Sequence, residues 1–205
     1  LGTIVQPKMV ISDVDTLLTL PEKEILNGLG EMTKYWVGWG SPTIRQLNTI
    51  TSPASTPGVE RDELIKIVSL CQEIKIEIVQ KDPYEKSGLR HKLNLGHTIG
   101  HAIEAAAGGK LSHGQAVAIG LAAVSKLSVM KGLLISNKCD QIILQLKKLG
   151  LPTTLKGIDK QKVFQALKLD KKGGSFVLIK DIGQLQTGVK VETALIEKVL
   201  EEVIV

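Results

Sequence analysis

Helical periodicity runs through most of this chain and constrains its fold more than any other feature of the sequence. Apolar side chains recur at steps of three and four residues at Ile25, Leu29, Met32 and Trp36, and this spacing lines one face of an amphipathic helix. The same spacing returns further along the chain. We therefore predict helices from Glu22 onward and over residues 60–81, 94–107, 114–131, 137–149, 159–169 and 193–205.

Extended structure is predicted for three short segments. Residues 8–14 alternate in polarity and hold enough β-branched side chains for a strand. Residues 176–179 and 188–191 have glycines on both sides, which is typical of a small β ribbon.

These elements predict a mainly α fold in two unequal parts. A β strap and linker over residues 1–21 leads into a multi-helical domain with a small β ribbon over residues 22–205. Residues 41–58 hold three prolines and many Ser and Thr residues, which predicts a loop or a broken helix pair inside that domain. Because the chain starts at Leu1 with an extended segment and no Met, we expect the strap to continue from a preceding part of the protein.

Composition excludes several classes of protein. The chain has 205 residues with 43% hydrophobic and 23% charged residues, which is ordinary for a folded domain and not for a disordered tail. Aromatic residues make up only 3%, so a stacking platform for single-stranded nucleic acid is not expected. The net charge of +5 is spread along the chain and indicates neither a nucleic-acid nor a membrane partner. The most apolar stretch, residues 116–124, is too short to cross a bilayer.

The two cysteines argue against disulfide bonds and against a cysteine zinc site. Cys71 and Cys139 are isolated and lack a C-x-x-C partner, so neither a disulfide framework nor a cysteine zinc site is indicated. A cytoplasmic location is expected.

Three of the histidines fall in one short region. His97 and His101 are four residues apart and share a helix face, and His113 follows after a Gly-Gly turn. Imidazole is a common zinc ligand, although such a pair is equally compatible with ordinary histidines bonded to the backbone. Thr98 stands where the H-E-x-x-H metalloprotease helix has its glutamate, so that hydrolase is excluded.

Glu31 is the best candidate for a third ligand. It lies among apolar residues in the predicted first helix, beside Gly28 and Gly30, which would let another backbone or a ligand come close. Lys34 follows three residues later on the same face. Spacing alone favours an ordinary Glu31–Lys34 surface ion pair over a ligand role.

Candidate anion-binding side chains occur on neighbouring segments. Lys75, Arg90, Asn94 and the KKGG stretch at residues 171–174 could converge on a carboxylate or a phosphate, because Arg forks around planar anions and Lys acts as a mobile charge. Each of them taken singly is compatible with a solvent-facing residue.

Four segments in this order resemble the C-terminal domain of the 3-dehydroquinate synthases, a family of sugar phosphate cyclases: GLGEMTKYW, SGLRHKLNLGHTIGHAIEAAAG, LSHGQAVAIGL and LDKKGGSFVLIKDIG. The leading TIVQPKMVISDVDTLLTLPEKE resembles the stretch that joins the nucleotide-binding half of that enzyme to its helical half. The resemblance implies conversion of 3-deoxy-arabino-heptulosonate 7-phosphate to 3-dehydroquinate, the second step of the shikimate pathway. It also implies NAD, a divalent metal (zinc or cobalt) and a homodimer.

The resemblance implies a role for individual residues. Glu31, His97 and His113 would bind the metal, and Lys34 and His101 would be catalytic. The substrate carboxylate would bind to Lys75 and Arg90, and its phosphate to Asn94, His101 and Lys171, with Lys172 as the alternative if the register shifts by one. The adenine end of NAD would touch Thr16, Leu17, Leu18 and Thr19.

Three departures from the family pattern bear on these roles. The stretch KDPYEKSGLR is one residue longer than in many members, which puts the placement of Lys75 relative to Arg90 in question. Gln115 stands where many members have Glu, which removes a possible carboxylate behind the metal site. The Gly-rich dinucleotide-binding domain is expected to precede Leu1, so this chain alone is expected to bind zinc without synthase turnover.

Alternative functions stay open at this point. One is another sugar phosphate cyclase, of the 2-deoxy-scyllo-inosose or valiolone type, or a more distant glycerol dehydrogenase. The other is a stand-alone metal-binding or dimer-forming module without enzymatic activity.

Overall fold

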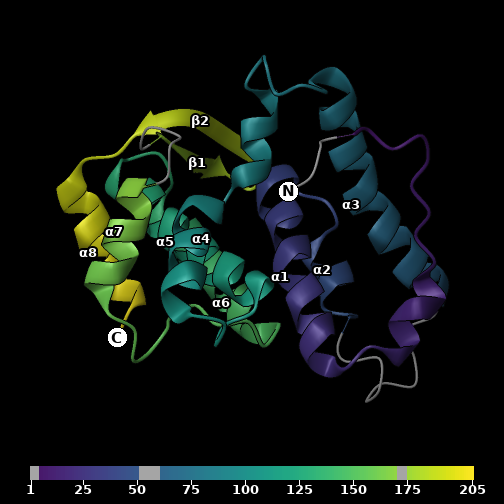
Figure 1. The fold of residues 1–205 in the computed structure, drawn as a ribbon, viewed down its shortest axis with the longest axis horizontal. Coiled ribbons are helices and arrows are strands. Elements are labelled where there is room, and N and C mark those ends of the chain that lie inside the picture. Colours follow the sequence, from purple (N-terminus) through teal and green to yellow (C-terminus); the bar gives the residue numbers. More distant parts are fainter. Residues whose placement is uncertain (1–4, 51–60, 170–174) are drawn as a thin grey trace.

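The computed structural model describes residues 5–50, 61–169 and 175–205. Two 3-10 helices, eight α-helices and one β hairpin make up this part of the chain (Figure 1). Their order and bounds are η1 Val14–Thr19, α1 Glu22–Trp39, α2 Ile44–Leu47, α3 Arg61–Lys81, η2 Leu89–Asn94, α4 His97–Ala107, α5 His113–Met130, α6 Ser136–Lys148, α7 Lys160–Leu169, β1 Ser175–Asp181, β2 Gln184–Lys190 and α8 Thr193–Val203.

Helix α5 is the centre of the fold. Its side chains from Ala116 to Leu127 are apolar on nearly every face and are buried except for Lys126. A helix that is apolar all round must be covered on all sides. Helices α1, α4, α6 and α8 and strand β1 provide that cover. A capping box between Ser112 and Gln115 starts α5 directly after the preceding loop.

Glycines allow α1 and α4 to come unusually close to α5. A Cβ atom on Gly30 of α1 would lie 2.2 Å from the carbonyl oxygen of Gly114, and one on Gly120 of α5 would lie 2.0 Å from that of Gly96. No side chain fits at these distances. Gly28, expected to allow a similar approach, has no atom within 4 Å of its Cβ position. The contact at Gly30 brings the first turn of α5 against the middle of α1.

The β ribbon forms as predicted and is longer than expected. Strands β1 and β2 pair antiparallel, with Phe176 opposite Val189 and Ile179 opposite Leu185. The middle of β1 is buried against α5, where the Ile179 amide donates to Ser128 Oγ across 2.9 Å.

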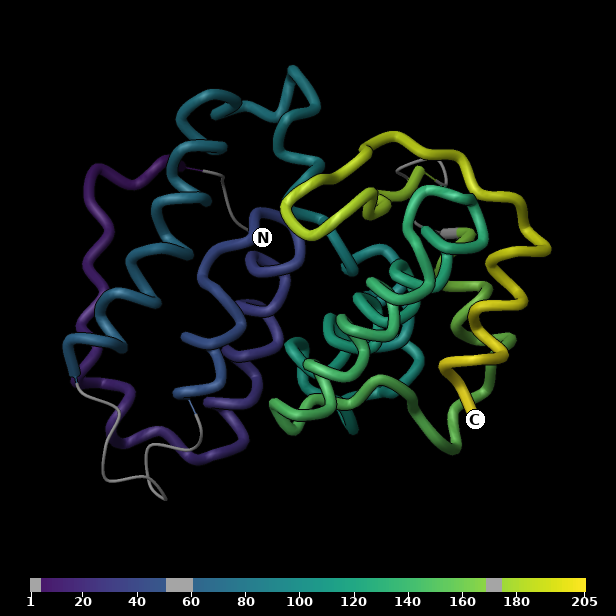
Figure 2. The backbone as a smooth tube through the Cα atoms, turned by 180° about the vertical axis from the view of Figure 1, so that it is seen from behind, coloured from purple at the N-terminus to yellow at the C-terminus, as the bar shows by residue number. Residues whose placement is uncertain are grey.

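The strand predicted over residues 8–14 is wrong. Among the described residues it has no pairing partner: residues 5–13 are exposed and irregular, and the chain then forms η1. A strand needs a neighbouring strand to satisfy its backbone groups. Ion pairing of Arg61 with Asp15, 2.6 Å apart, and a hydrogen bond from Gln72 to Ser12 hold this segment along α3 (Figures 1 and 2).

The remaining helices begin and end within a few residues of their predicted positions. The helix expected from residue 94 begins at His97, because Gly96, its N-cap residue, takes a left-handed φ of 76° that an α-helix cannot include. The loop or broken helix pair predicted over residues 41–58 contains α2, and its residues 51–58 lie outside the described part. In the described part of the chain, no helix is both long and apolar enough to cross a membrane.

Candidate metal centre

A carboxylate and two imidazoles from three different helices meet at one point. The Oε1 atom of Glu31 on α1 lies 3.1 Å from Nε2 of His97 on α4 and 3.1 Å from Nε2 of His113 on α5. In a tetrahedral zinc site with bonds of roughly 2.0–2.1 Å, neighbouring ligand atoms are about 3.3 Å apart. The observed separations therefore come close to those of a zinc coordination shell.

The outer ring nitrogens of both histidines are already engaged. Nδ1 of His97 lies 3.0 Å from the carbonyl oxygen of Leu95, which can only accept, so this nitrogen carries a proton and donates it. Nδ1 of His113 lies 2.9 Å from Oε2 of Glu104. Both rings therefore direct Nε2 toward Glu31.

This proton arrangement fits a bound cation. With both rings neutral and Nδ1 protonated, two Nε2 lone pairs and the Glu31 carboxylate oxygen converge with no donor between them. Such a set of acceptors is stable only with positive charge at its centre, supplied either by extra protons on the rings or by a metal ion. Two nitrogens and one oxygen with a remaining open position are the donor set of a catalytic zinc or cobalt site.

Lys34 gives Glu31 a buried cationic neighbour. Its ammonium lies 2.7 Å from Glu31 Oε2 and 5.1 Å from the centre of the Tyr35 ring, and the residue is only 4% exposed. The Glu31–Lys34 ion pair favoured by spacing is therefore present, but its Lys34 end is buried and the pair is part of the histidine cluster instead of an open surface. Burial would raise the pKa of the Glu31 carboxyl, but without a metal ion a hydrogen bond donated by His97 Nε2 and the charge of Lys34 outweigh it and hold the pKa well below its usual range.

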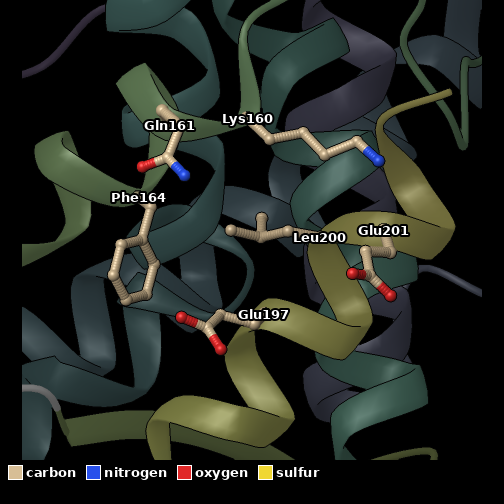
Figure 3. Close-up of a pocket in the computed structure, with 6 residues that line it drawn as sticks. All are labelled: Lys160, Gln161, Phe164, Glu197, Leu200 and Glu201. Atoms are coloured by element: carbon tan, nitrogen blue, oxygen red, sulfur yellow. The ribbon is translucent and has the colours of Figure 1, made fainter.

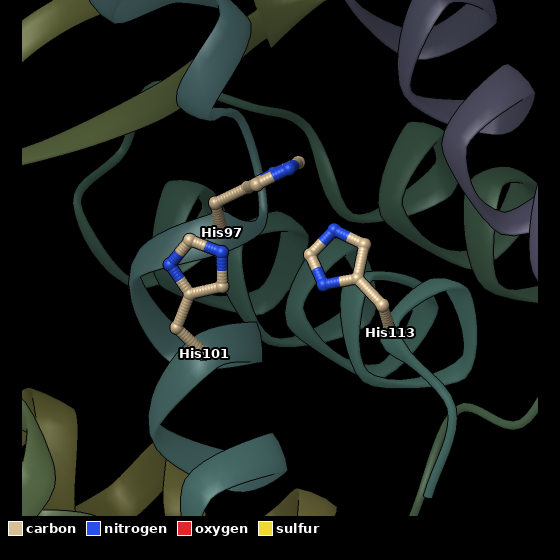
Figure 4. Close-up of side chains that lie close together, drawn as sticks. All are labelled: His97, His101 and His113. Carbon is tan, nitrogen blue, oxygen red and sulfur yellow. The ribbon is translucent and has the colours of Figure 1, made fainter. Parts of the chain in front are cut away.

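His101 lies beside the same cluster (Figure 4). Its ring centre is 5.2 Å from that of His97 and 5.5 Å from that of His113, and one nitrogen from each of the three rings lies within 4.8 Å of the others. A three-histidine ligand set is thus a geometric alternative. The short distances from Glu31 to His97 and His113 favour the set that contains Glu31.

Two of the predicted anion-binding residues lie on one turn next to the histidines. Arg90 and Asn94 are both on η2, which leads directly into α4. The Arg90 guanidinium donates to the Pro83 carbonyl across 3.2 Å, and Asn94 lines a small cavity together with Thr98. Lys75 is exposed on α3, which packs against η2, and within the described residues it forms no hydrogen bond or ion pair.

The remaining predicted site residues are either outside the described part of the chain or on η1. Lys171 and Lys172 lie outside the described residues. The predicted NAD segment forms η1, which packs on α3, and α1 lies between it and α4 in both views (Figures 1 and 2). Its hydroxyls bond locally, Thr16 to the Asp13 carbonyl at 2.6 Å and Thr19 to the Thr16 carbonyl at 3.2 Å, whereas Leu17 is half-buried and Leu18 is 70% exposed.

The sequence pattern assigned Asp82 no role in the site. It is 3% exposed, and its carboxylate accepts from the backbone amides of Lys86 at 2.7 Å, Ser87 at 3.2 Å and Arg90 at 3.5 Å. Burial would raise the pKa of Asp82, but these hydrogen bonds outweigh it and lower the pKa to about 2. Residues 81–90, the stretch that is one residue longer than in many family members, are thus folded around the Asp82 carboxylate.

Glu104 and Asn27 were also missed. Glu104 lies seven residues after His97, so it shares a helix face with His97 and His101, and that spacing could have identified it. Asn27 lies one turn before Glu31 and contacts Gly114 from another helix, a long-range contact with no local sequence signal.

A separate cavity of about 240 Å³ lies between α7 and α8 (Figure 3). None of the predicted site residues lines it. Its walls are formed by Lys160, Gln161, Phe164, Glu197, Leu200 and Glu201.

Comparison with known proteins identifies the family of this chain. The family model for the 3-dehydroquinate synthase C-terminal domain matches residues 28–173. The chain is 38% identical over 212 residues to a 3-dehydroquinate synthase of Synechococcus sp., a match that covers 99% of this chain and 56% of that protein. It is 39% identical over 208 residues to a 3-dehydroquinate synthase of Thermodesulfovibrio yellowstonii, covering 98% and 57% respectively.

Solved structures share the fold. A 2-deoxy-scyllo-inosose synthase complexed with carbaglucose-6-phosphate, NAD+ and Co2+ superposes with a TM-score of 0.77 at 26% identity, covering 93% of this chain and 55% of that one. The 2-epi-5-epi-valiolone synthase of Streptomyces hygroscopicus, with NAD+ and Zn2+ bound, has a TM-score of 0.80 at 22% identity, covering 93% and 54%, and supports the fold alone. The chain, which spans about 56% of the length of the curated relatives it matches, belongs to the 3-dehydroquinate synthase family through its C-terminal domain.

Proposed function

We propose that this chain is the metal- and substrate-binding part of a 3-dehydroquinate synthase. The whole enzyme would convert 3-deoxy-arabino-heptulosonate 7-phosphate to 3-dehydroquinate and phosphate with NAD and a divalent metal. The observation that carries the proposal is the placement of Glu31 Oε1 at 3.1 Å from Nε2 of both His97 and His113, in a chain 38% identical to a synthase of this name.

Glu31, His97 and His113 would hold the metal, with zinc and cobalt both suited to this donor set. When bound, the ion would acidify a substrate hydroxyl and hold the sugar in place. The solved 2-deoxy-scyllo-inosose synthase, with its Co2+ and NAD+, supports a divalent metal and NAD for this chain as well.

Lys34 and His101 would act on the substrate beside these ligands. The Lys34 ammonium, buried at Glu31 Oε2, would stabilise negative charge that develops on the substrate oxygen. His101 is exposed at the edge of the cluster, where its ring could donate a hydrogen bond to the substrate phosphate and transfer a proton.

The substrate would be held by its two anionic ends. Arg90 and Lys75 would bind the carboxylate, and Asn94, His101 and Lys171, or Lys172, the phosphate. The position of Arg90 and Asn94 on one turn that leads into α4 supports this assignment. A cyclase whose sugar has no carboxylate would leave Arg90 unpaired in its site, which favours the carboxylated substrate over the 2-deoxy-scyllo-inosose and valiolone types.

NAD would be bound mainly by another part of the protein. The relatives are nearly twice as long as this chain, and Val5, Met9, Val10 and Ile11 expose at least 67% of their surface on the segment that leads into η1. These observations support residues 1–21 as a strap that packs on a nucleotide-binding domain, with Thr16, Leu17, Leu18 and Thr19 near the adenine of NAD. Residues 22–205 would be the metal and substrate domain, in a cytoplasmic homodimer.

The test is phosphate release by the full-length protein. With the phosphorylated sugar acid, NAD and zinc, we expect steady release that stops on chelation and returns with zinc or cobalt. This 205-residue chain by itself should show none. Equal turnover of a sugar phosphate without the carboxylate would contradict the substrate assignment, and a folded full-length protein without NAD-dependent release would contradict the synthase.

A further inference from the structure

We infer that Glu104 is a positioning residue that fixes the orientation and proton arrangement of His113 and thereby sets the metal affinity of the centre. The inference rests on the proposed metal site. It concerns a side chain that would not touch the ion.

Glu104 reaches His113 across the Gly108–Gly109 turn. It lies near the end of α4, on the helix face that carries His97 and His101, while His113 begins α5. The turn folds the two helices back on each other and places Glu104 Oε2 at 2.9 Å from His113 Nδ1.

The His113 ring is held between two carboxylates. Its Nε2 faces Glu31 Oε1 at 3.1 Å and its Nδ1 faces Glu104 Oε2 at 2.9 Å. An ionised carboxylate can only accept, so Glu104 selects the form of the ring in which Nδ1 carries the proton. The lone pair of Nε2 then points toward Glu31, where a metal ligand needs it.

The acceptor at Nδ1 of His113 is a charged carboxylate, whereas the acceptor at Nδ1 of His97 is a neutral carbonyl. Nδ1 of His97 donates to the neutral Leu95 carbonyl at 3.0 Å, whereas that of His113 donates to a carboxylate. A negatively charged acceptor makes the imidazole a stronger donor to the metal. Removing Glu104 should therefore weaken metal binding through His113 in particular.

Gln115 cannot take this role. Its amide oxygen accepts from the Ser112 backbone at 3.1 Å in the capping box that starts α5, so its side chain is occupied away from the His113 ring. The carboxylate that the sequence lacks at residue 115 is supplied by Glu104 from the neighbouring helix.

The test measures zinc affinity by competition with a chromophoric chelator. Glu104→Ala should weaken zinc binding by about 10- to 100-fold, and Glu104→Gln by less, because the amide oxygen keeps an acceptor for Nδ1–H without the charge. Glu73→Ala, at an exposed position on α3, is the control and should bind as the unmodified chain does. In the cobalt-loaded chain, Glu104→Ala should also shift the visible absorption bands, whereas Glu73→Ala should leave them unchanged.

The outcomes separate this inference from the proposed function. Glu104 variants that bind zinc and give cobalt spectra like the unmodified chain would overturn the inference alone. An unmodified chain that binds no zinc would overturn the metal centre and the inference with it. If Glu104→Ala does not fold, as judged by circular dichroism without metal, the zinc affinities of Glu104→Gln and Glu73→Gln are compared instead. Weaker binding by Glu104→Gln supports the inference, and equal binding overturns it.

Discussion

The Asn27 side chain accepts a hydrogen bond from the backbone amide of Gly114 across 2.6 Å. This bond satisfies one of the free amides in the first turn of α5 from a different helix, α1. Glu31 follows Asn27 by one helical turn, and His113 precedes Gly114 by one residue. The same contact that joins the two helices thus places the carboxylate against the imidazole.

We expect a methyl group at Gly114 to break this junction. Its Cβ would lie 1.9 Å from the Asn27 carbonyl oxygen, so α1 or α5 must move, and overpacking of this kind costs about 1–3 kcal/mol. Urea unfolding of Gly114→Ala should show this loss, and zinc affinity should fall because Glu31 and His113 separate.

Gly28→Ala is the matched control for that change. It lies on the same helix with no atom within 4 Å of the added methyl group, so it should be neutral or stabilise by about 0.5–1 kcal/mol. A Gly114→Ala variant as stable as Gly28→Ala would contradict the close packing described here.

Asp82 should make the stability of the chain sensitive to acid. Its pKa is about 2 in the folded state, whereas an unfolded aspartate has a pKa of about 3.9. Because the folded-state pKa is the lower one, the stabilisation is fully present above about pH 4 and is lost as the pH falls toward 2.

Asp82→Asn tests this dependence. At neutral pH the variant should unfold at a lower urea concentration than the unmodified chain, and the difference should shrink between about pH 5 and 2. Asp140→Asn, at an exposed position on α6, should follow the unmodified chain at every pH. A difference for Asp82→Asn that stays constant with pH would show that its carboxylate charge is not what holds the turn.

Lys34 should affect the chemical step more than substrate binding. In the full-length enzyme, Lys34→Gln removes the buried ammonium at Glu31 Oε2, and loss of a group that stabilises transition-state charge costs about 100- to 1,000-fold in kcat. KM should change little. Lys66→Gln, which breaks the exposed Glu63–Lys66 pair with the same spacing on α3, should leave both constants unchanged. A Lys34→Gln effect confined to KM would place this residue in substrate binding only.

Local patterns predicted most of the fold, and long-range contacts account for what they missed. The period of the apolar residues identified the helices because burial of one face repeats along the chain. It could not show that Gly96 takes a left-handed φ of 76° and moves the start of α4 to His97. The alternation over residues 8–14 satisfied a strand pattern, but the described residues offer no partner strand.

The same distinction applies to the metal centre. The four-residue step from His97 to His101 and the nearby His113 were visible in the sequence, whereas the role of Glu31 depends on the approach of Gly30 to Gly114. Its apolar surroundings and neighbouring glycines made Glu31 the best candidate for a third ligand, but spacing alone favoured a surface ion pair with Lys34. Glu104 could have been found by extending the same helical spacing by one more turn.

Zinc binding to single variants of this chain tests the central claim most directly. The unmodified chain should bind about one equivalent of zinc, as a single tetrahedral site requires. Glu31→Ala, His97→Ala and His113→Ala should each lose most of the affinity, and His101→Ala should keep it. Retention of tight binding by Glu31→Ala, together with its loss in His101→Ala, would contradict the account and assign the metal to the three histidines.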